Sequence, residues 1–457
     1  MNTGPVVDIR LDRRQPLGSQ IERRLRALVQ SRTLPVGSKL PSTRTLAADL
    51  GVSRGVVVAA YAQLAGEGYI ELRRSAAPVV AVQGRVPDGV RVDPDLPVAR
   101  ARSTCLPDFA LFPRTSWVAA VRAAVGHAQG GDFSYGEPFG TGALRLSLAP
   151  FLARTRGVVA APDRTGIFAG SSQALLVVAS VLRSLGAQRI GVEDPGHRWR
   201  TATLASSGLE VVPIRVDDEG VRVDELPDVA AVVVSPDHQF PLGVALSARR
   251  RRALVDWASE RDRLVIEHDF DGYYRYDQAS SGALQALAPE HVVYVGSASA
   301  LLAPALRLGW AVLPARLVEP VAQELFTTAI GGPRLTQLAL AEFISRGHLD
   351  RHLRRTAAAF KRRRTALLEA LEEHLPEAVP TGTAGGLFLS VRLPADIAEP
   401  ALVRAARRRG VALDGINEHA SSPHPPGLAI GFAAAPEPTL RRGAKLLGAA
   451  REDVLAA

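Results

Sequence analysis

The sequence predicts a multi-domain chain: a small N-terminal α+β unit, then a larger α/β unit with a mostly parallel, doubly wound sheet and a small C-terminal α+β subdomain. Three observations predict it. The 457 residues exceed the usual size of one domain. Residues 1–80 hold twelve Lys and Arg against six Asp and Glu, which accounts for most of the formal net charge of +9. Beyond residue 105, short β-branched runs alternate with helical stretches.

The composition excludes several classes of protein. Cys105 is the only cysteine, so no internal disulfide can form. The first residues lack the apolar segment of a secretion signal, and the most apolar stretch, residues 301–318, is interrupted by Pro and Arg. No metal-ligand spacing is present, and no catalytic group is assigned. We therefore expect a cytoplasmic protein without a membrane span.

The N-terminal unit begins with three predicted helices. Apolar residues recur at helical spacing over residues 16–32. Ser42 is a good N-cap for a short helix through residue 50, and Gly51 ends that helix. A second N-cap, Ser53, opens a helix that continues to about residue 67. The spacing is typical of a helix, a tight turn and a second helix.

Two short strands follow, at about residues 68–74 and 78–82, around a small loop. Together with the helices they predict a winged helix-turn-helix over residues 1–82, and the basic charge indicates nucleic acid as its partner. A segment rich in Pro, Arg and Asp at residues 83–104 predicts a linker.

The larger unit is expected over residues 105–457, with residues 334–457 as the small subdomain. Its strands are predicted at residues 189–194, 230–235, 264–269, 292–297 and 309–314. One antiparallel strand can join this largely parallel sheet.

Residues 40–70, LPSTRTLAADLGVSRGVVVAAYAQLAGEGYI, resemble the DNA-binding module of GntR-type bacterial regulators. That resemblance implies that the helix from Ser53 enters the major groove of an operator with its first residues. Arg54 then forks to a guanine, while other side chains contact phosphates. The implied DNA-contacting set is Lys39, Ser42, Arg44, Ser53, Arg54, Tyr61, Arg73 and Arg74.

The segments FSYGEPFGTGALR (133–145), SPDHQFPLG (235–243) and EHDFDGYYRY (267–276) occur in an order that resembles the MocR subfamily of GntR-type regulators. In that subfamily a fold-type I aminotransferase domain acts as an effector sensor, so the resemblance implies pyridoxal 5'-phosphate. A phosphate would bind the helix start at 171–173, with Arg307, Ser297 and Ser299 beside it.

The same resemblance places Ala300 at the position of the lysine that forms the Schiff base. The chain has only three lysines, Lys39, Lys361 and Lys445, so the cofactor can be held non-covalently at most. His268 stands at the position of the acidic residue that pairs with the pyridine nitrogen. The implied cofactor set is Ser171, Ser172, Gln173, His197, His268, Asp269, Ser297, Ser299 and Arg307.

These features predict a homodimeric transcriptional regulator that binds double-stranded DNA and a small-molecule effector. Two alternatives stay open: an aminotransferase-like enzyme fused to a DNA-binding domain, and a dimerisation scaffold without any ligand. A ligand-induced thermal shift separates the sensor from the scaffold.

Overall fold

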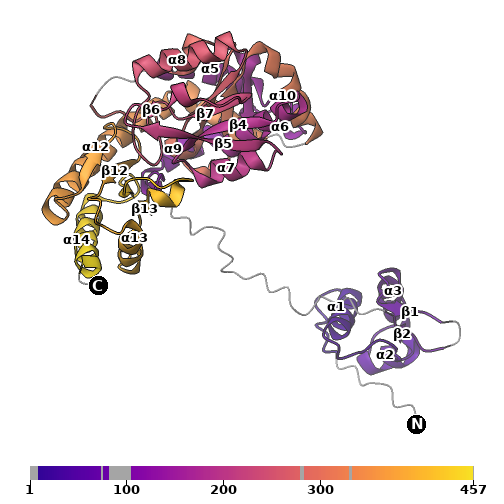
Figure 1. Cartoon of the computed structure of the whole chain (residues 1–457). Helices are drawn as coiled ribbons and strands as arrows, with labels where there is room; N and C mark the ends of the chain where they lie inside the picture. Colours follow the sequence, from indigo (N-terminus) through magenta and orange to yellow (C-terminus); the bar gives the residue numbers. More distant parts are fainter. Residues whose placement is uncertain (1–8, 74–75, 82–103, 278–281, 329–331, 456–457) are drawn as a thin grey trace. The chain divides into compact units, whose positions relative to one another are not determined.

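The computed structural model describes residues 9–73, 76–81, 104–277, 282–328 and 332–455. The chain divides into two compact units, Met1–Arg100 and Ala101–Ala457 (Figure 1). Apart from Thr104, the predicted linker lies outside the described residues. Among the helices of the described ranges, none combines the length and the apolar character that a membrane span needs.

The N-terminal unit is a winged helix-turn-helix, as predicted. Its core is a single cluster of buried apolar side chains, among them Ile21, Leu25 and Val57. The two strands pair antiparallel and flank the wing. The elements are α1 (Leu17–Gln30), α2 (Thr43–Leu50), α3 (Arg54–Gly66), β1 (Ile70–Glu71) and β2 (Val79–Val80).

Two local signals set the turn between α2 and α3. The Ser42 hydroxyl accepts a hydrogen bond from the backbone N–H of Thr45 at 3.1 Å and so caps α2. At the other end, Gly51 has φ 61°, a left-handed conformation that glycine adopts at low cost. The chain therefore turns sharply at Gly51 and enters α3 through Ser53.

An eight-stranded sheet organises the second unit. Its strand order is β3-β10-β9-β8-β7-β4-β5-β6, and the five strands from β9 to β5 in this order run parallel. β10 runs antiparallel to both of its neighbours, and β6 forms a hairpin with β5. The strands are β3 (Thr165–Phe168), β4 (Arg189–Asp194), β5 (Glu210–Asp217), β6 (Gly220–Val221), β7 (Ala231–Val234), β8 (Leu264–Asp269), β9 (Val292–Ser297) and β10 (Gly309–Val312).

Helices cover both faces of this sheet (Figure 1). Alternate side chains of β7 show the two faces, because Ala231 and Val233 belong to one apolar cluster while Val232 and Val234 belong to another. Side chains of α6 and α10 belong to the first cluster, so these helices cover one face of the sheet. Side chains of α5, α8 and α11 pack on the opposite face. The helices are α4 (Arg114–His127), α5 (Gly142–Arg156), α6 (Ser171–Ser184), α7 (Arg198–Ala205), α8 (Ala248–Glu260), α9 (Ala298–Leu301), α10 (Ala315–Thr327) and α11 (Arg334–Ser345).

The C-terminal part of this unit has its own antiparallel sheet, ordered β11-β12-β14-β13. α11 packs on α4 and α5, whereas the 27-residue α12 packs on α14. The elements are α12 (His348–His374), β11 (Val379–Thr381), β12 (Phe388–Arg392), α13 (Glu399–Arg408), β13 (Asp414–Gly415), β14 (Gly427–Gly431) and α14 (Glu437–Leu455).

Candidate functional site

The start of α3 presents the side chains expected to read DNA. Ser53 occupies the N-cap position, but its hydroxyl makes no capping hydrogen bond within the described residues. Arg54 is exposed, and its Nε donates a 3.4 Å hydrogen bond to Thr43 Oγ1. Lys39 and Arg44 are exposed on the same unit. This helix start therefore offers a hydroxyl, a guanidinium and free N–H groups to a polyanion.

The structure corrects the expectation for Tyr61. Its side chain is completely buried in the core, and its hydroxyl donates a 2.9 Å hydrogen bond to the carbonyl oxygen of Pro41. Burial also raises the pKa of Tyr61 well above its usual value. Tyr61 therefore fastens α3 to the segment before α2 and cannot reach a phosphate. On the wing, Arg73 pairs with Glu71 at 3.0 Å, and Arg74 lies outside the described residues.

In the second unit, the chain passes from β3 into α6 through Gly170, whose φ of 114° requires glycine. The backbone N–H groups of Ser171, Ser172 and Gln173 form the first turn of α6. β10 approaches this turn so closely that a Cβ on Gly309 would lie 2.8 Å from the backbone nitrogen of Ser171. The sequence thus builds an open helix start of the kind that binds phosphate.

Arg307 lies beside this helix start. A Cβ placed on Gly170 would be 3.8 Å from Arg307 Nη1, and the Arg307 side chain is exposed. Within the described part of the chain its guanidinium makes no hydrogen bond or ion pair. The hydroxyl of Ser297 accepts a 3.2 Å hydrogen bond from Ser299 N and caps α9. The predicted phosphate residues are thus brought together around one charged, unpaired arginine.

The region beside this cradle is filled with rings. His197 stacks on Phe240 with ring centroids 3.9 Å apart and an interplanar angle of 2°. Trp199 lies 5.6 Å from His197 and 5.8 Å from His268, centroid to centroid. Phe270 lies 6.2 Å from His268. His197 and the segment 235–243, which contains Phe240, were named from the sequence. No spacing rule predicted that the Trp199 and Phe240 rings would pack here.

His268 and Asp269 lie on opposite faces of β8. Both ring nitrogens of His268 are buried without a hydrogen-bond partner in the described structure, and burial lowers the pKa of His268 far below its usual value. The Asp269 carboxylate instead accepts hydrogen bonds from Arg156 Nε and the Tyr294 hydroxyl, both at 2.6 Å. Asp269 is thus fully engaged in a buried ion-pair network, which corrects its expected place in the cofactor set.

Ala300 is completely buried in α9, directly after β9. It packs in the same apolar cluster as Tyr274, whose hydroxyl lies 3.5 Å from the Ala300 carbonyl oxygen. All three lysines of the chain are exposed and lie elsewhere, Lys39 in the N-terminal unit, Lys361 within α12 and Lys445 within α14. Neither lysine of the second unit belongs to the elements that form the cradle.

These residues accommodate the phosphate of pyridoxal phosphate but not its pyridine ring. Two rings whose centroids are 3.9 Å apart are already in van der Waals contact, so no third ring fits between His197 and Phe240. At the position expected for a carboxylate, the neutral His268 imidazole faces the Trp199 ring. These rings therefore leave no stacking space between His197 and Phe240, and His268 presents an imidazole in place of a carboxylate.

Two family models match the chain. Residues 17–80 match "Bacterial regulatory proteins, gntR family", and residues 108–447 match "Aminotransferase class I and II". Among solved structures, the kynurenine aminotransferase of Pyrococcus horikoshii has a TM-score of 0.70 at 26% identity, covering 77% of this chain and 90% of that one. The two matches correspond to the two units of the structure.

Relatives with both parts are similar over nearly their whole length. The HTH-type pyridoxine biosynthesis transcriptional regulator PdxR of Corynebacterium glutamicum is 32% identical over 436 residues, 93% of each chain. The HTH-type transcriptional regulator TauR of Rhodobacter capsulatus is 31% identical over 432 residues, 86% of this chain and 88% of that one. The chain belongs to the GntR-type transcriptional regulators that carry an aminotransferase class I and II domain.

Proposed function

We propose that this protein is a sequence-specific DNA-binding regulator whose aminotransferase-like unit dimerises and senses a small ligand without covalent lysine chemistry. The observation that carries the proposal is the contrast between its two sites. The helix start at Ser53 and Arg54 is exposed and ready to bind a polyanion, whereas the cofactor region combines a buried Ala300 with a filled ring pocket. The chain thus has the exposed side chains that DNA recognition needs, but it lacks a lysine at the position proposed for transamination chemistry.

In the DNA-bound protein, Arg54 contacts a base edge and Lys39, Arg44, Ser53 and Arg73 contact the backbone. Ser42 is occupied as a cap by Thr45 N, so its role is to hold α2 in place. Truncating a base-contacting arginine costs about 1–3 kcal/mol and relaxes specificity at one position, while a phosphate contact weakens all sequences alike.

The test is a gel-shift titration of the full-length protein on an operator selected from random duplexes. We expect Arg54→Ala to weaken operator binding at least about tenfold and to reduce the preference for operator over random DNA. Arg23→Ala, an exposed arginine on α1, is the matched control and leaves that preference intact. Equal loss in both variants would contradict base reading by Arg54.

The sensor part of the proposal rests on Ala300 standing where the Schiff-base lysine of aminotransferases stands. Two features support this: α9 follows β9 directly, and the two lysines of this unit lie in α12 and α14 rather than in the cradle elements. Pyridoxal phosphate itself binds non-covalently at most, through its phosphate at Ser171, Ser172 and Arg307. Titration with pyridoxal phosphate followed by borohydride reduction tests this, since the exposed Lys39, Lys361 and Lys445 of the wild type should give only a non-saturating background adduct. A saturating adduct of one per chain in the wild type would overturn the assignment of Ala300.

A homodimer is supported by an exposed apolar stripe on α4. Val118, Val121 and Val125 share one face of this helix and are 37–46% exposed. Tyr135 and Phe133, which follow α4 in the chain, are 100% and 60% exposed. A patch of this kind on a folded domain marks a protein interface, and a two-fold dimer suits a palindromic operator.

A further inference from the structure

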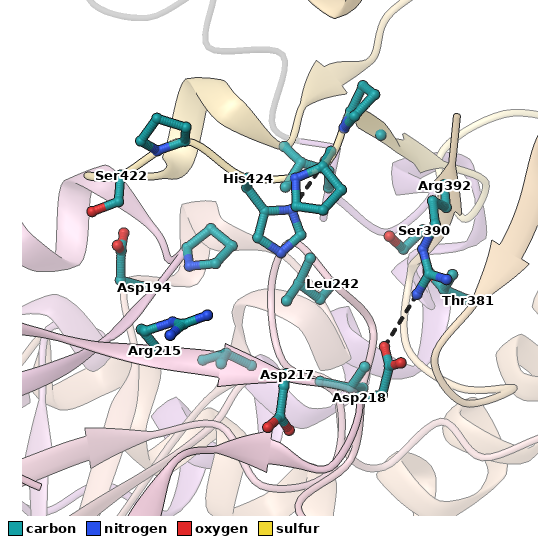
Figure 2. A pocket seen from close by; sticks show the side chains of 18 of the residues that line it. Asp194, Arg215, Asp217, Asp218, Leu242, Thr381, Ser390, Arg392, Ser422 and His424 are labelled. Atoms are coloured by element: carbon teal, nitrogen blue, oxygen red, sulfur yellow. Dashed lines mark hydrogen bonds and ion pairs between the residues drawn. The ribbon is translucent and has the colours of Figure 1, made fainter. Parts of the chain in front are cut away.

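The aminotransferase-like unit contains a cavity that neither Ala300 nor any residue of the phosphate cradle lines. It has a volume of about 420 Å³, at the small end of the range for ligand sites. One wall comes from the large sheet, at the ends of β4 and β5 and the loop after β7. The other comes from β11, β12 and the loop before β14 (Figure 2). A ligand here would touch both the large sheet and the C-terminal subdomain.

The ends of β4 and β5 place opposite charges side by side. Asp194 and Arg215 are direct register partners on these parallel strands, and both line the cavity. Figure 2 shows Arg215 just below Asp194. The two do not form an ion pair with each other. Within the described residues, the exposed Arg215 guanidinium has no partner at all, whereas Asp194 accepts one 2.7 Å hydrogen bond from Ser421 N.

The other acidic side chains of the cavity are already paired. Asp217 accepts a 2.7 Å hydrogen bond from Arg250, and Asp218 pairs with Arg392 at 3.3 Å at the far end (Figure 2). Consequently the charges that remain for a ligand are one guanidinium, on Arg215, and one carboxylate, on Asp194. A carboxylate and an ammonium on neighbouring atoms of one molecule would satisfy both.

Between these ends the walls are apolar. His424 lies over the middle of the cavity (Figure 2), and its Nδ1–H donates a 3.0 Å hydrogen bond to the Pro425 carbonyl oxygen. The apolar lining is contributed by Val216, Leu242, Val244, Val391, Ile416, Pro423, Pro425 and Pro426. This surface suits a short hydrocarbon side chain.

We propose that this cavity binds a free amino acid with an apolar side chain, its carboxylate on Arg215 and its ammonium on Asp194. A regulatory role for this amino acid rests on the proposed function, whereas its binding to the cavity does not.

The loop that closes the cavity is tied to the large sheet at two points. Ser421 N donates to Asp194, and Gly196 N donates to the His419 carbonyl oxygen at 3.0 Å. The His419 ring also packs edge-on against Phe240 at 4.8 Å. An amino acid on Asp194 competes with the first tie and so shifts the C-terminal subdomain relative to the sheet. This gives the ligand a route to alter the conformation of the dimer.

Isothermal titration of the full-length protein with L-leucine, L-valine and L-methionine tests the proposal. We expect at least one to bind, and to bind about tenfold or more tightly than the matching molecules that lack one charge; for L-leucine these are 4-methylpentanoate and 3-methylbutylamine. Arg215→Ala should abolish the tight binding. The control Arg252→Ala, an exposed arginine of α8 that does not line the cavity, should retain it.

Asp194→Asn separates the two charges, because the amide oxygen can still accept from Ser421 N. This variant should lose the preference for L-leucine over 4-methylpentanoate while keeping the affinity for the latter. If none of the three amino acids binds wild-type protein that still binds its operator, the cavity assignment is overturned and the proposed function stands. If an amino acid binds but no duplex is recognised, the proposed function fails and the cavity assignment stands.

Discussion

Phe240 is stacked on His197, the residue that the family resemblance places beside the cofactor ring. Restoring a lysine at position 300 alone therefore leaves the ring pocket filled by Trp199, His197 and Phe240. We expect the Ala300→Lys, Phe240→Ala double variant to form more borohydride-reducible adduct with pyridoxal phosphate than Ala300→Lys does, because it removes the ring stacked on His197. The adduct is quantified by absorbance after reduction. Equal yields from the two variants would mean that Phe240 does not obstruct the ring.

Tyr61 lies within the DNA-binding motif, yet its side chain packs in the core of the N-terminal unit and does not face DNA. In Tyr61→Phe the Pro41 carbonyl loses its 2.9 Å donor inside the core, which costs about 1 kcal/mol. We expect faster amide exchange in α3 of the full-length protein and an unchanged operator affinity. Tyr69→Phe, which loses a more exposed bond from Gln30, should affect exchange less. A large drop in operator affinity from Tyr61→Phe alone would restore its assignment as a phosphate contact.

At the scale of elements, β8 is joined to the segment Leu284–Leu287 through a buried carboxylate. Glu267 accepts hydrogen bonds from the backbone N–H groups of Leu284 and Gln285, at 3.1 and 3.0 Å. Burial, then the nearby charges of Asp269 and Asp237, raises the pKa of Glu267 from 4.5 to about 7. The folded state thus binds this proton more tightly than the unfolded chain. Its contribution to stability is present below pH 4.5 and is lost as the pH rises through 7.

Glu267→Gln removes this titration. We expect the free energy of unfolding of the wild type relative to the variant to fall between pH 4.5 and 8, by up to about 3 kcal/mol for a shift of this size. Urea unfolding at pH 5 and at pH 8 measures the difference. Glu260→Gln, at the exposed end of α8, is the control: its free energy of unfolding should differ from that of the wild type by the same amount at both pH values. A wild type that gains stability over Glu267→Gln as the pH rises would contradict the assignment.

The helix-turn-helix could be predicted at the scale of elements because its signals are local. Ser42 caps α2 and Gly51 ends it by turn chemistry, whatever the rest of the chain does, and Ser53 takes the N-cap position of α3 without a capping hydrogen bond among the described residues. The parallel strands were predictable from short buried runs, as in β4 and β8. β5 was not among the predicted strands, because Pro213 and exposed residues interrupt its apolar positions and β6 covers its outer edge only at Val216 and Asp217.

The cofactor region could be predicted only in part. Its phosphate half follows from a glycine before a helix, which is a local feature. The stacking of His197 on Phe240 joins residues 43 positions apart, and the cavity at Arg215 joins β5 to a loop some 200 residues later. No periodicity in one segment reports such contacts, because they depend on how distant elements pack.

At the scale of the whole molecule, the exposed stripe on α4 predicts the dimer. A charge at its centre, Val121→Asp, would bury an unpaired carboxylate in the interface, a cost of several kcal/mol that a homodimer carries twice. We therefore expect Val121→Asp to sediment as a monomer. It should also bind a palindromic operator much more weakly than the wild-type protein does. Leu185→Asp, at the exposed C-terminal end of α6, introduces the same charge outside the stripe and should remain dimeric. Sedimentation velocity of both variants decides the matter: a dimeric Val121→Asp protein would place the interface elsewhere, and a monomeric Leu185→Asp protein would extend it to α6.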